Sequence, residues 1–413
     1  MIGKIKTLLF SDTSRDTAVI MGGNLAVALG GTLFTIVVAR SLSPINFGIF
    51  SAIFALATLF SSLADLGISS ALINFLPKVK GGRSTIISVT FWMQLGIALL
   101  LSSLSLGFLP IRQDTLPGAQ SLHIIYLSIL IIPLVFESFA LAILKAEKRF
   151  FFVSLIMTLD SWMKLILTYL LLRFNLLDIS SVLLASIAAS SLATAFAISK
   201  ELKYVRPIFP KAQVSRIVHF AKWIALVRVF SVGISRIDII LLNAIGSSFQ
   251  AGIYAASSRI TLLYAMLVSS LGSVVAPRFS AFTTKQQVKD YILKLLLLTT
   301  FFALGMIALL EFAPLIIRIV YGEAYLSTVP IFRYLTYAMI PFLYATVTTN
   351  PLIFYFNKPN FIAFTTVIQI FIIVALDLAL IPSFGAIAPA ISLAVSNSVV
   401  LLLTGWKLIR LLK

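Results

Sequence analysis

The sequence contains no cysteine and only two histidines in 413 residues. Without cysteine there is no disulfide, no thiol nucleophile and no cysteine-ligated metal, and two histidines are too few for a histidine-rich metal site. We also find no glycine-rich phosphate loop followed by lysine and no nucleophile elbow. These absences exclude the usual metal, nucleotide and hydrolase sites. We therefore expect a protein that is not an enzyme and that carries no cofactor.

Charge is scarce, and most of it has one sign. Charged residues make up 11% of the chain, with 14 Asp and Glu against 32 Lys and Arg, for a formal net charge of +18. A basic patch of that size would suggest nucleic acid, but here the cations are scattered between apolar runs, so we expect no nucleic-acid partner. Hydrophobic residues reach 60% and the mean hydropathy is +1.07. This composition is typical of an all-α membrane protein with many spans.

Apolar runs long enough to cross a bilayer follow one another along the whole chain. A hydrocarbon core of about 30 Å needs roughly 20 apolar residues in a helix. Twelve runs satisfy this criterion, at residues 17–39, 45–76, 86–109, 121–144, 150–172, 179–199, 217–245, 251–276, 291–313, 328–356, 360–381 and 386–408. We expect the long second run to protrude into the membrane interface.

The connecting segments indicate the orientation. With both termini placed in the cytoplasm, the inner segments carry twenty-two Lys and Arg residues and the outer segments carry five. This asymmetry follows the positive-inside rule and agrees with an even number of spans. We therefore expect both termini to be cytoplasmic and most loop cations to orient helices and contact membrane lipids.

The chain resembles two copies of a six-helix unit. A polar connection with two prolines and five cations, Lys200 to Arg216, lies near the midpoint and is typical of a linker. Shifted by 204 positions, "SPINFGIFSA" (Ser43 to Ala52) aligns without a gap with "SSFQAGIYAA" (Ser247 to Ala256). "IIPLVF" around Pro133 likewise matches "MIPFLY" around Pro341. We predict two pseudo-symmetric lobes, 1–203 and 204–413.

The seventh predicted span carries Arg228, Arg236 and Asp238. A charge at the bilayer centre costs about 2.5–3.5 kcal/mol, so we expect these side chains to face protein or water. At about 100° per residue they share an arc of roughly 160° with Ser231, Ser235 and Asn243. Arg259 in the next span lies within a turn or two of the depth of Arg236. Arginines so placed could bind an anionic group through bidentate hydrogen bonds, and the alternative is a structural ion pair of Asp238 with Arg228 or Arg259.

Other charged residues and prolines inside spans suggest further roles. Asp160 and Lys164, four residues apart, favour an ion pair, although Lys164 is also a candidate cavity residue. Asp65 is expected near the inner end of the second span, in a structural or gating role. Glu137 and Asp377 are candidates for coupling to H⁺ or Na⁺, or for packing as neutral acids. Pro133, Pro341 and Pro351 interrupt helical hydrogen bonds and could act as hinges.

Five segments carry a family resemblance: "VARSLSPINFGIFSAIFAL", "SSLADLGISSALINFLPK", "SRIDIILLNAIGSSFQAGIYAASSRI", "TTNPLIFYFNKPNF" and "SFGAIAPAISLAVSN". They resemble the polysaccharide transporters, or O-antigen flippases, of the multidrug/oligosaccharidyl-lipid/polysaccharide (MOP) exporter superfamily. The resemblance covers nearly the whole chain, and the matching positions are Arg40, Gly48, Asp65, Gly67, Asp238, Gly252, Tyr254, Asn350, Lys358 and Gly385. Ala388-Pro389 departs from the family pattern, in which Gly and then Ala are frequent, and this suggests that the last helix starts differently.

The resemblance implies a flippase in the bacterial cytoplasmic membrane, with the two lobes around a central cavity in which Arg228, Arg236 and Arg259 would hold a diphosphate. Its substrate would be a polyprenyl-diphosphate-linked oligosaccharide for O-antigen, lipopolysaccharide or another surface polysaccharide, moved by alternating access. Arg40 joins Arg228, Arg236, Arg259 and Lys164 as a candidate cavity residue, and a glycan polymerase and a chain-length regulator are candidate partners. The alternative is an ion-coupled multidrug exporter of the same superfamily, although drug cations would favour a more acidic cavity. A membrane glycan polymerase or ligase fits less well, because the outer loops are short.

Overall fold

The computed structural model describes residues 12–79, 82–199 and 201–413, and within these ranges it is helical and contains no strand. Side chains are not described for residues 12–18, 112, 223, 226–235, 269, 270, 273, 274 and 277. The all-α class is therefore confirmed.

The helices of the first part of the chain follow the expected runs closely. They are α2 (Asp12–Ser41), α3 (Pro44–Asp65), α4 (Ile68–Phe75), α5 (Arg83–Ser105), α6 (Phe108–Thr115), α7 (Ser121–Ala146), α8 (Phe150–Arg173) and α9 (Ile179–Ile198). Short 3₁₀ turns, η1 (Leu76–Lys78) and η2 (Leu202–Tyr204), follow α4 and α9.

The second part of the chain is also helical. It contains α10 (Lys211–Leu241), α11 (Ser248–Ala281), α12 (Lys285–Leu309), α13 (Ala313–Tyr321), α14 (Val329–Phe354), α15 (Pro359–Phe384) and α16 (Ala388–Leu412). A π-helical turn, η3 (Leu242–Gly246), continues α10, and the 3₁₀ turns η4 (Glu323–Thr328) and η5 (Gly385–Ile387) precede α14 and α16.

The second predicted run is not one continuous helix. It divides into α3 and α4 because Leu66 and Gly67 adopt left-handed backbone angles, with φ of 39° and 76°. A side chain at Gly67 would also meet the carbonyl oxygen of Ala221 at 2.9 Å, so glycine suits this position for two reasons. Asp65 therefore ends a helix at an internal break, and α4 accounts for the extra length of the run.

Nine segments among the described residues are long and apolar enough to cross a membrane, and the last, Pro359–Leu412, includes both α15 and α16. The segments so identified include neither α10 nor α14. α14 carries prolines, threonines and tyrosines, which lower its mean hydropathy, and the middle of α10, residues 226–235, lies outside the residues whose side chains are described. A multi-pass membrane protein is the consistent interpretation.

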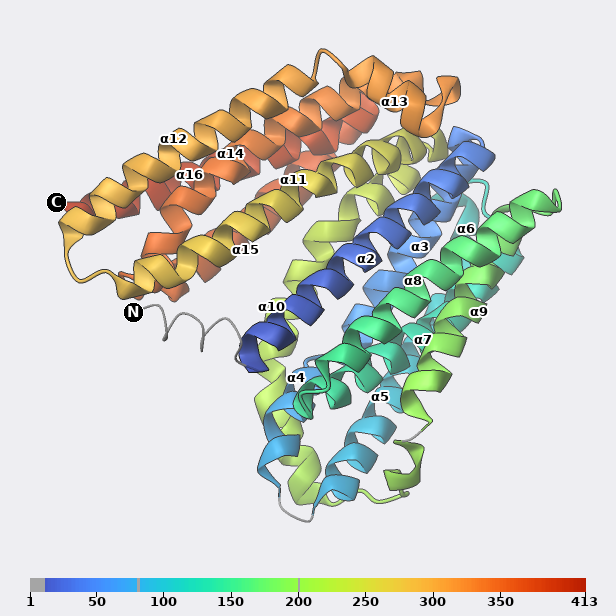
Figure 1. Cartoon of the computed structure of the whole chain (residues 1–413). Helices are drawn as coiled ribbons and strands as arrows, with labels where there is room; N and C mark the ends of the chain where they lie inside the picture. The colour runs from blue at the N-terminus through green and yellow to red at the C-terminus, as the bar shows by residue number, and fades with distance from the viewer. Residues whose placement is uncertain (1–11, 80–81, 200) are drawn as a thin grey trace. The chain divides into compact units, whose positions relative to one another are not determined.

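The chain forms two compact units, which we describe separately. The first comprises Met1–Leu42 and Ala52–Arg236, and the second comprises Ser43–Ser51 and Ile237–Lys413. In the first unit α2 packs along α8, and α7 packs against α5, α8 and α9 (Figure 1). In the second unit α14 packs between α11 and α16, with α12 beside α14 and α15 beside α16. The lobe boundary at residue 203 stays a prediction.

The segments that suggested a duplication start their helices in the same way. α3 begins one residue after Ser43, and α11 begins one residue after Ser247. The Ser43 hydroxyl accepts a hydrogen bond from the backbone N–H of Asn46 at 3.3 Å, and the Ser247 hydroxyl accepts one from the backbone N–H of Gln250 at 3.2 Å. Each serine is thus an N-cap that satisfies an otherwise unpaired amide. The 204-residue offset therefore relates local structure as well as sequence.

Candidate functional site

Two buried carboxylates from separate helices interact within the second unit. Asp238 in α10 accepts a hydrogen bond from the Tyr254 hydroxyl in α11, with 2.6 Å between the oxygens. Asp377 in α15 is completely buried and lies close enough to interact electrostatically with Asp238 and Tyr254. It also interacts with the Ser392 hydroxyl, yet neither of its oxygens has a partner of normal hydrogen-bond geometry among the described residues. Such unsatisfied acidic oxygens suit a proton or a small cation.

Further polar atoms lie at the nearby end of α10. The π-helical turn η3 contains Asn243, which is fully buried, and neither its amide nitrogen nor its oxygen has a described hydrogen-bond partner. One oxygen of Asp238 and the side-chain oxygen of Gln250 are also buried without a described partner. Because single π turns recur at functional sites and buried polar atoms are normally paired, this region is a candidate ligand site.

The arginines of the predicted diphosphate site differ in what the structure describes. Arg236 is partly buried at the end of the first unit, and it makes interactions with its surroundings. Arg259 in α11 is partly buried in the second unit, interacts electrostatically with Tyr321, and has a buried Nε without a described acceptor. The side chain of Arg228 lies outside the described residues. The described hydrogen-bond partner of Asp238 is the Tyr254 hydroxyl and not Arg259.

The predicted ion pair in α8 forms in the interior of the first unit. Lys164 Nζ lies 2.6 Å from Asp160 Oδ2, with the two side chains 9% and 13% exposed. The other oxygen of Asp160 accepts a hydrogen bond from Ser190 in α9 at 2.8 Å. Glu137 in α7 interacts electrostatically with both members of the pair. The ammonium group of Lys164 already has a carboxylate partner, and its role as a cavity residue stays a prediction.

Asp65 organises a second polar network that the sequence did not reveal. Asp65 Oδ1 accepts hydrogen bonds from the Ser69 amide and from Gln94 Nε2, each at 3.0 Å. Gln94 also donates to the Ser69 hydroxyl at 3.3 Å, and that hydroxyl lies 3.4 Å from the hydroxyl of Ser138. The network connects α3, α4, α5 and α7. Gln94 is fully buried. In the sequence, a single polar amide within an apolar run was the one sign of this network.

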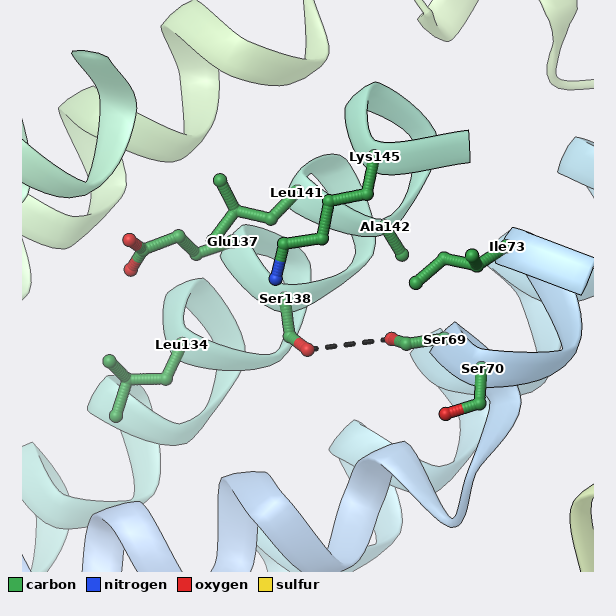
Figure 2. A pocket seen from close by; sticks show the side chains of 9 residues that line it. All are labelled: Ser69, Ser70, Ile73, Leu134, Glu137, Ser138, Leu141, Ala142 and Lys145. Carbon is green, nitrogen blue, oxygen red and sulfur yellow. Dashed lines mark hydrogen bonds between the residues drawn. The ribbon is translucent and has the colours of Figure 1, made fainter. Parts of the chain in front are cut away.

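This network forms one side of a cavity in the first unit. The cavity has a volume of about 240 Å³ and lies between α4 and α7, and its lining includes Glu137 and Lys145 (Figure 2). From the sequence, Lys145 is expected to be a loop cation that orients a helix. In the structure its side chain lines this cavity. The cavity therefore combines hydroxyls, a carboxylate and an ammonium group.

The remaining predicted site residues lie apart from these clusters. Pro133 is buried inside α7, and its carbonyl oxygen accepts a hydrogen bond from Thr194 Oγ1 in α9 at 3.0 Å. Pro341 lies inside α14, and Arg40 is exposed in the last turn of α2. In the described part of the chain, no group of three or more His, Cys, Asp and Glu side chains is placed to hold a metal ion.

Four charged residues in or beside the connecting segments form a network of ion pairs. Arg83 Nη2 lies 2.6 Å from Glu147 and 2.7 Å from Glu201, and Arg149 Nη1 lies 3.5 Å and 3.6 Å from the same two acids. The Arg83 guanidinium also stacks 4.3 Å from the centre of the Tyr204 ring. This network joins the start of α5, the connection between α7 and α8, and the segment after α9.

Comparisons with known proteins agree with this architecture. A family model described as "Polysaccharide biosynthesis protein" matches residues 37–330. A structure of the lipid II flippase MurJ in an inward closed conformation superposes with a TM-score of 0.78, covering 94% of this chain and 87% of MurJ at 17% identity. A multidrug resistance MATE family transporter of the MOP superfamily, inward-facing, gives a TM-score of 0.74, covering 93% and 94% at 15% identity. A comparison with curated proteins found no match.

Proposed function

Because the chain belongs to the polysaccharide biosynthesis protein family, we propose that it is a flippase for a polyprenyl-diphosphate-linked oligosaccharide, such as the repeat unit of O-antigen or another surface polysaccharide. The family match is the observation that carries this proposal, and the fold shared with the flippase MurJ supports it. The glycan would cross the bacterial cytoplasmic membrane by alternating access, as residues 1–203 rock against 204–413. A glycan polymerase and a chain-length regulator would use the product, and the flippase itself catalyses no bond change.

In this proposal the arginines hold the diphosphate. Arg259 is the best supported of them, because its partly buried guanidinium has an Nε–H without a described acceptor, which an anionic oxygen would satisfy. Arg236 and Arg228 on α10 would contact the same group, and Arg40 and Lys164 would contact the glycan or its carrier. The polyprenyl tail would stay in lipid, since its methylene groups gain nothing by entering a polar cavity.

The arginine assignment can be tested by export in cells. We expect Arg259→Ala and Arg236→Ala each to lower surface polysaccharide at least tenfold at equal protein level, because each removes a charge-assisted bond worth about 1.5–3 kcal/mol. Arg259→Lys should retain part of the activity. Arg318→Ala is the control, since Arg318 is 59% exposed and pairs with exposed Glu323. Wild-type export in both alanine variants would disprove the diphosphate assignment. Unchanged polysaccharide but lost drug resistance would favour the multidrug exporter.

We further propose that Asp238 and Asp377 couple export to H⁺ or Na⁺. The supporting observation is the burial of Asp377 with both oxygens unsatisfied beside a second carboxylate. Glu137 is the weaker candidate, since Lys164 already lies near it. Asp377→Asn should abolish the response of export to an imposed ion gradient in proteoliposomes, whereas Asp377→Glu should keep part of it. A gradient response that persists in Asp377→Asn and is lost in Glu137→Gln would move the coupling site to the first unit.

A further inference from the structure

We propose that the cavity between α4 and α7 binds one sugar ring of the transported glycan, an inference that rests on the proposed flippase function. Figure 2 shows the cavity, with Ser69 and Ser138 joined by a hydrogen bond and with the Glu137 and Lys145 side chains around them. Of the residues proposed to hold the diphosphate or to couple an ion, Glu137 alone lines this cavity.

The serine hydroxyls are oriented before any ligand arrives. Gln94 donates to Ser69 Oγ, and the hydroxyl oxygens of Ser69 and Ser138 lie 3.4 Å apart, so either hydroxyl can donate to the other. Gln94 in turn is fixed by its bond to Asp65, which is only 1% exposed. The hydroxyl that accepts in this contact keeps its own hydrogen as a donor for a ligand. Such an ordered set of donors and acceptors gives a polar site its specificity and lowers the entropic cost of binding.

The remaining lining matches a polyhydroxylated ring better than other ligands. Glu137 offers acceptors to sugar hydroxyls, Lys145 offers donors, and aliphatic side chains such as Ile73 and Leu141 can pack on ring carbons. An aromatic drug cation would favour aromatic walls, and none of the nine lining residues is aromatic.

The size of the cavity limits the ligand to a small part of the glycan. Its volume of about 240 Å³ lies below the roughly 300–1,000 Å³ of pockets that enclose drug-sized molecules. One ring of an oligosaccharide is a ligand of suitable size, and the other rings would extend beyond the cavity. The subsite would therefore recognise a single position of the repeat unit.

The test uses the full-length protein in nanodiscs and two kinds of probe. A panel of methyl glycosides is screened by saturation-transfer-difference NMR, and undecaprenyl diphosphate without sugar is measured separately. We expect ring-proton signals from at least one glycoside with the wild-type protein. Ser138→Leu fills the cavity and should abolish them, and Ser138→Ala, which keeps the space but removes a hydroxyl, should weaken the affinity about fivefold.

The controls separate the subsite from the flippase proposal and from misfolding. Ser103→Leu makes the same change on an exposed face of α5 and should leave glycoside signals unchanged. Both serine variants should bind undecaprenyl diphosphate as the wild type does. Glycoside signals that survive Ser138→Leu, or a wild type that binds undecaprenyl diphosphate but no glycoside, would overturn the subsite alone. Failure of the wild type to bind undecaprenyl diphosphate would instead overturn the diphosphate-linked substrate.

Discussion

At the scale of single residues, the network around Arg83 shows how little a loop charge reveals by itself. Glu201 has a side chain that is only 4% exposed, and its carboxylate depends on Arg83 and Arg149. Removing Arg83 would leave that buried acid with one distant partner, so we expect Arg83→Ala to destabilise the protein. Arg83 is 37% exposed, which reduces the loss from that of a fully buried pair to about 1–2 kcal/mol.

The measurement is thermal unfolding in detergent. Arg83→Ala should lower the melting temperature by several degrees, whereas Arg318→Ala, which breaks the exposed pair with Glu323 at 2.8 Å, should change it little. Glu201→Gln in the Arg83→Ala background should cost less than in the wild type, because the two residues share one interaction. Equal effects of Arg83→Ala and Arg318→Ala would show that the network adds no stability.

The sequence predicted the buried charges better than their partners. Arg236 and Asp238 lie inside the seventh apolar run, and helical periodicity places them on one side of it. Because a charge in contact with lipid is costly, the sequence indicated polar surroundings for both. It did not identify Tyr254 as the partner of Asp238, because an i, i+16 contact between two helices depends on packing. The four-residue spacing of Asp160 and Lys164, by contrast, was sufficient to predict their ion pair.

At the scale of helices, the duplicated segments meet at a glycine crossing. A Cβ added to Gly48 in α3 would collide with the carbonyl oxygen of Ser248, and one added to Gly252 in α11 would collide with that of Pro44. Since Pro44 and Ser248 are also separated by 204 residues, the contact is reciprocal. Ser43–Ser51 belongs to the second compact unit through such contacts, although it comes from the first half of the sequence.

This crossing gives a clear prediction. Gly252→Ala should destabilise the protein by about 1–3 kcal/mol, because backbone atoms cannot move aside for the added methyl group. Gly305→Ala in α12 is the matched control, since nothing lies within 4 Å of its added Cβ, and alanine favours a helix. Thermal unfolding of the two variants provides the comparison. A destabilisation of Gly305→Ala equal to that of Gly252→Ala would show that the crossing is not tightly packed.

The helices themselves were predictable, but their interruptions were only partly so. Apolar runs marked each long helix to within a few residues, since a membrane helix needs sustained hydropathy. The break at Leu66 and Gly67 escaped prediction because Leu66, a residue that favours helices, adopts a φ of 39° there. The cavity beside α4 escaped with it, since its position depends on where α4 begins.

At the scale of the whole molecule, the distribution of Lys and Arg predicts the orientation in the membrane. The absence of cysteine makes this testable without any background labelling, because each introduced cysteine is the one thiol in the chain. Leu176, between α8 and α9, is 64% exposed, and Lys203, in η2 after α9, is also exposed. A membrane-impermeant maleimide should label Leu176→Cys in intact cells. It should label Lys203→Cys only after the membrane has been permeabilised. The reverse labelling pattern would show that the protein has the opposite orientation in the membrane. The arginines proposed to bind the diphosphate would then have to receive the substrate from the opposite side of the membrane.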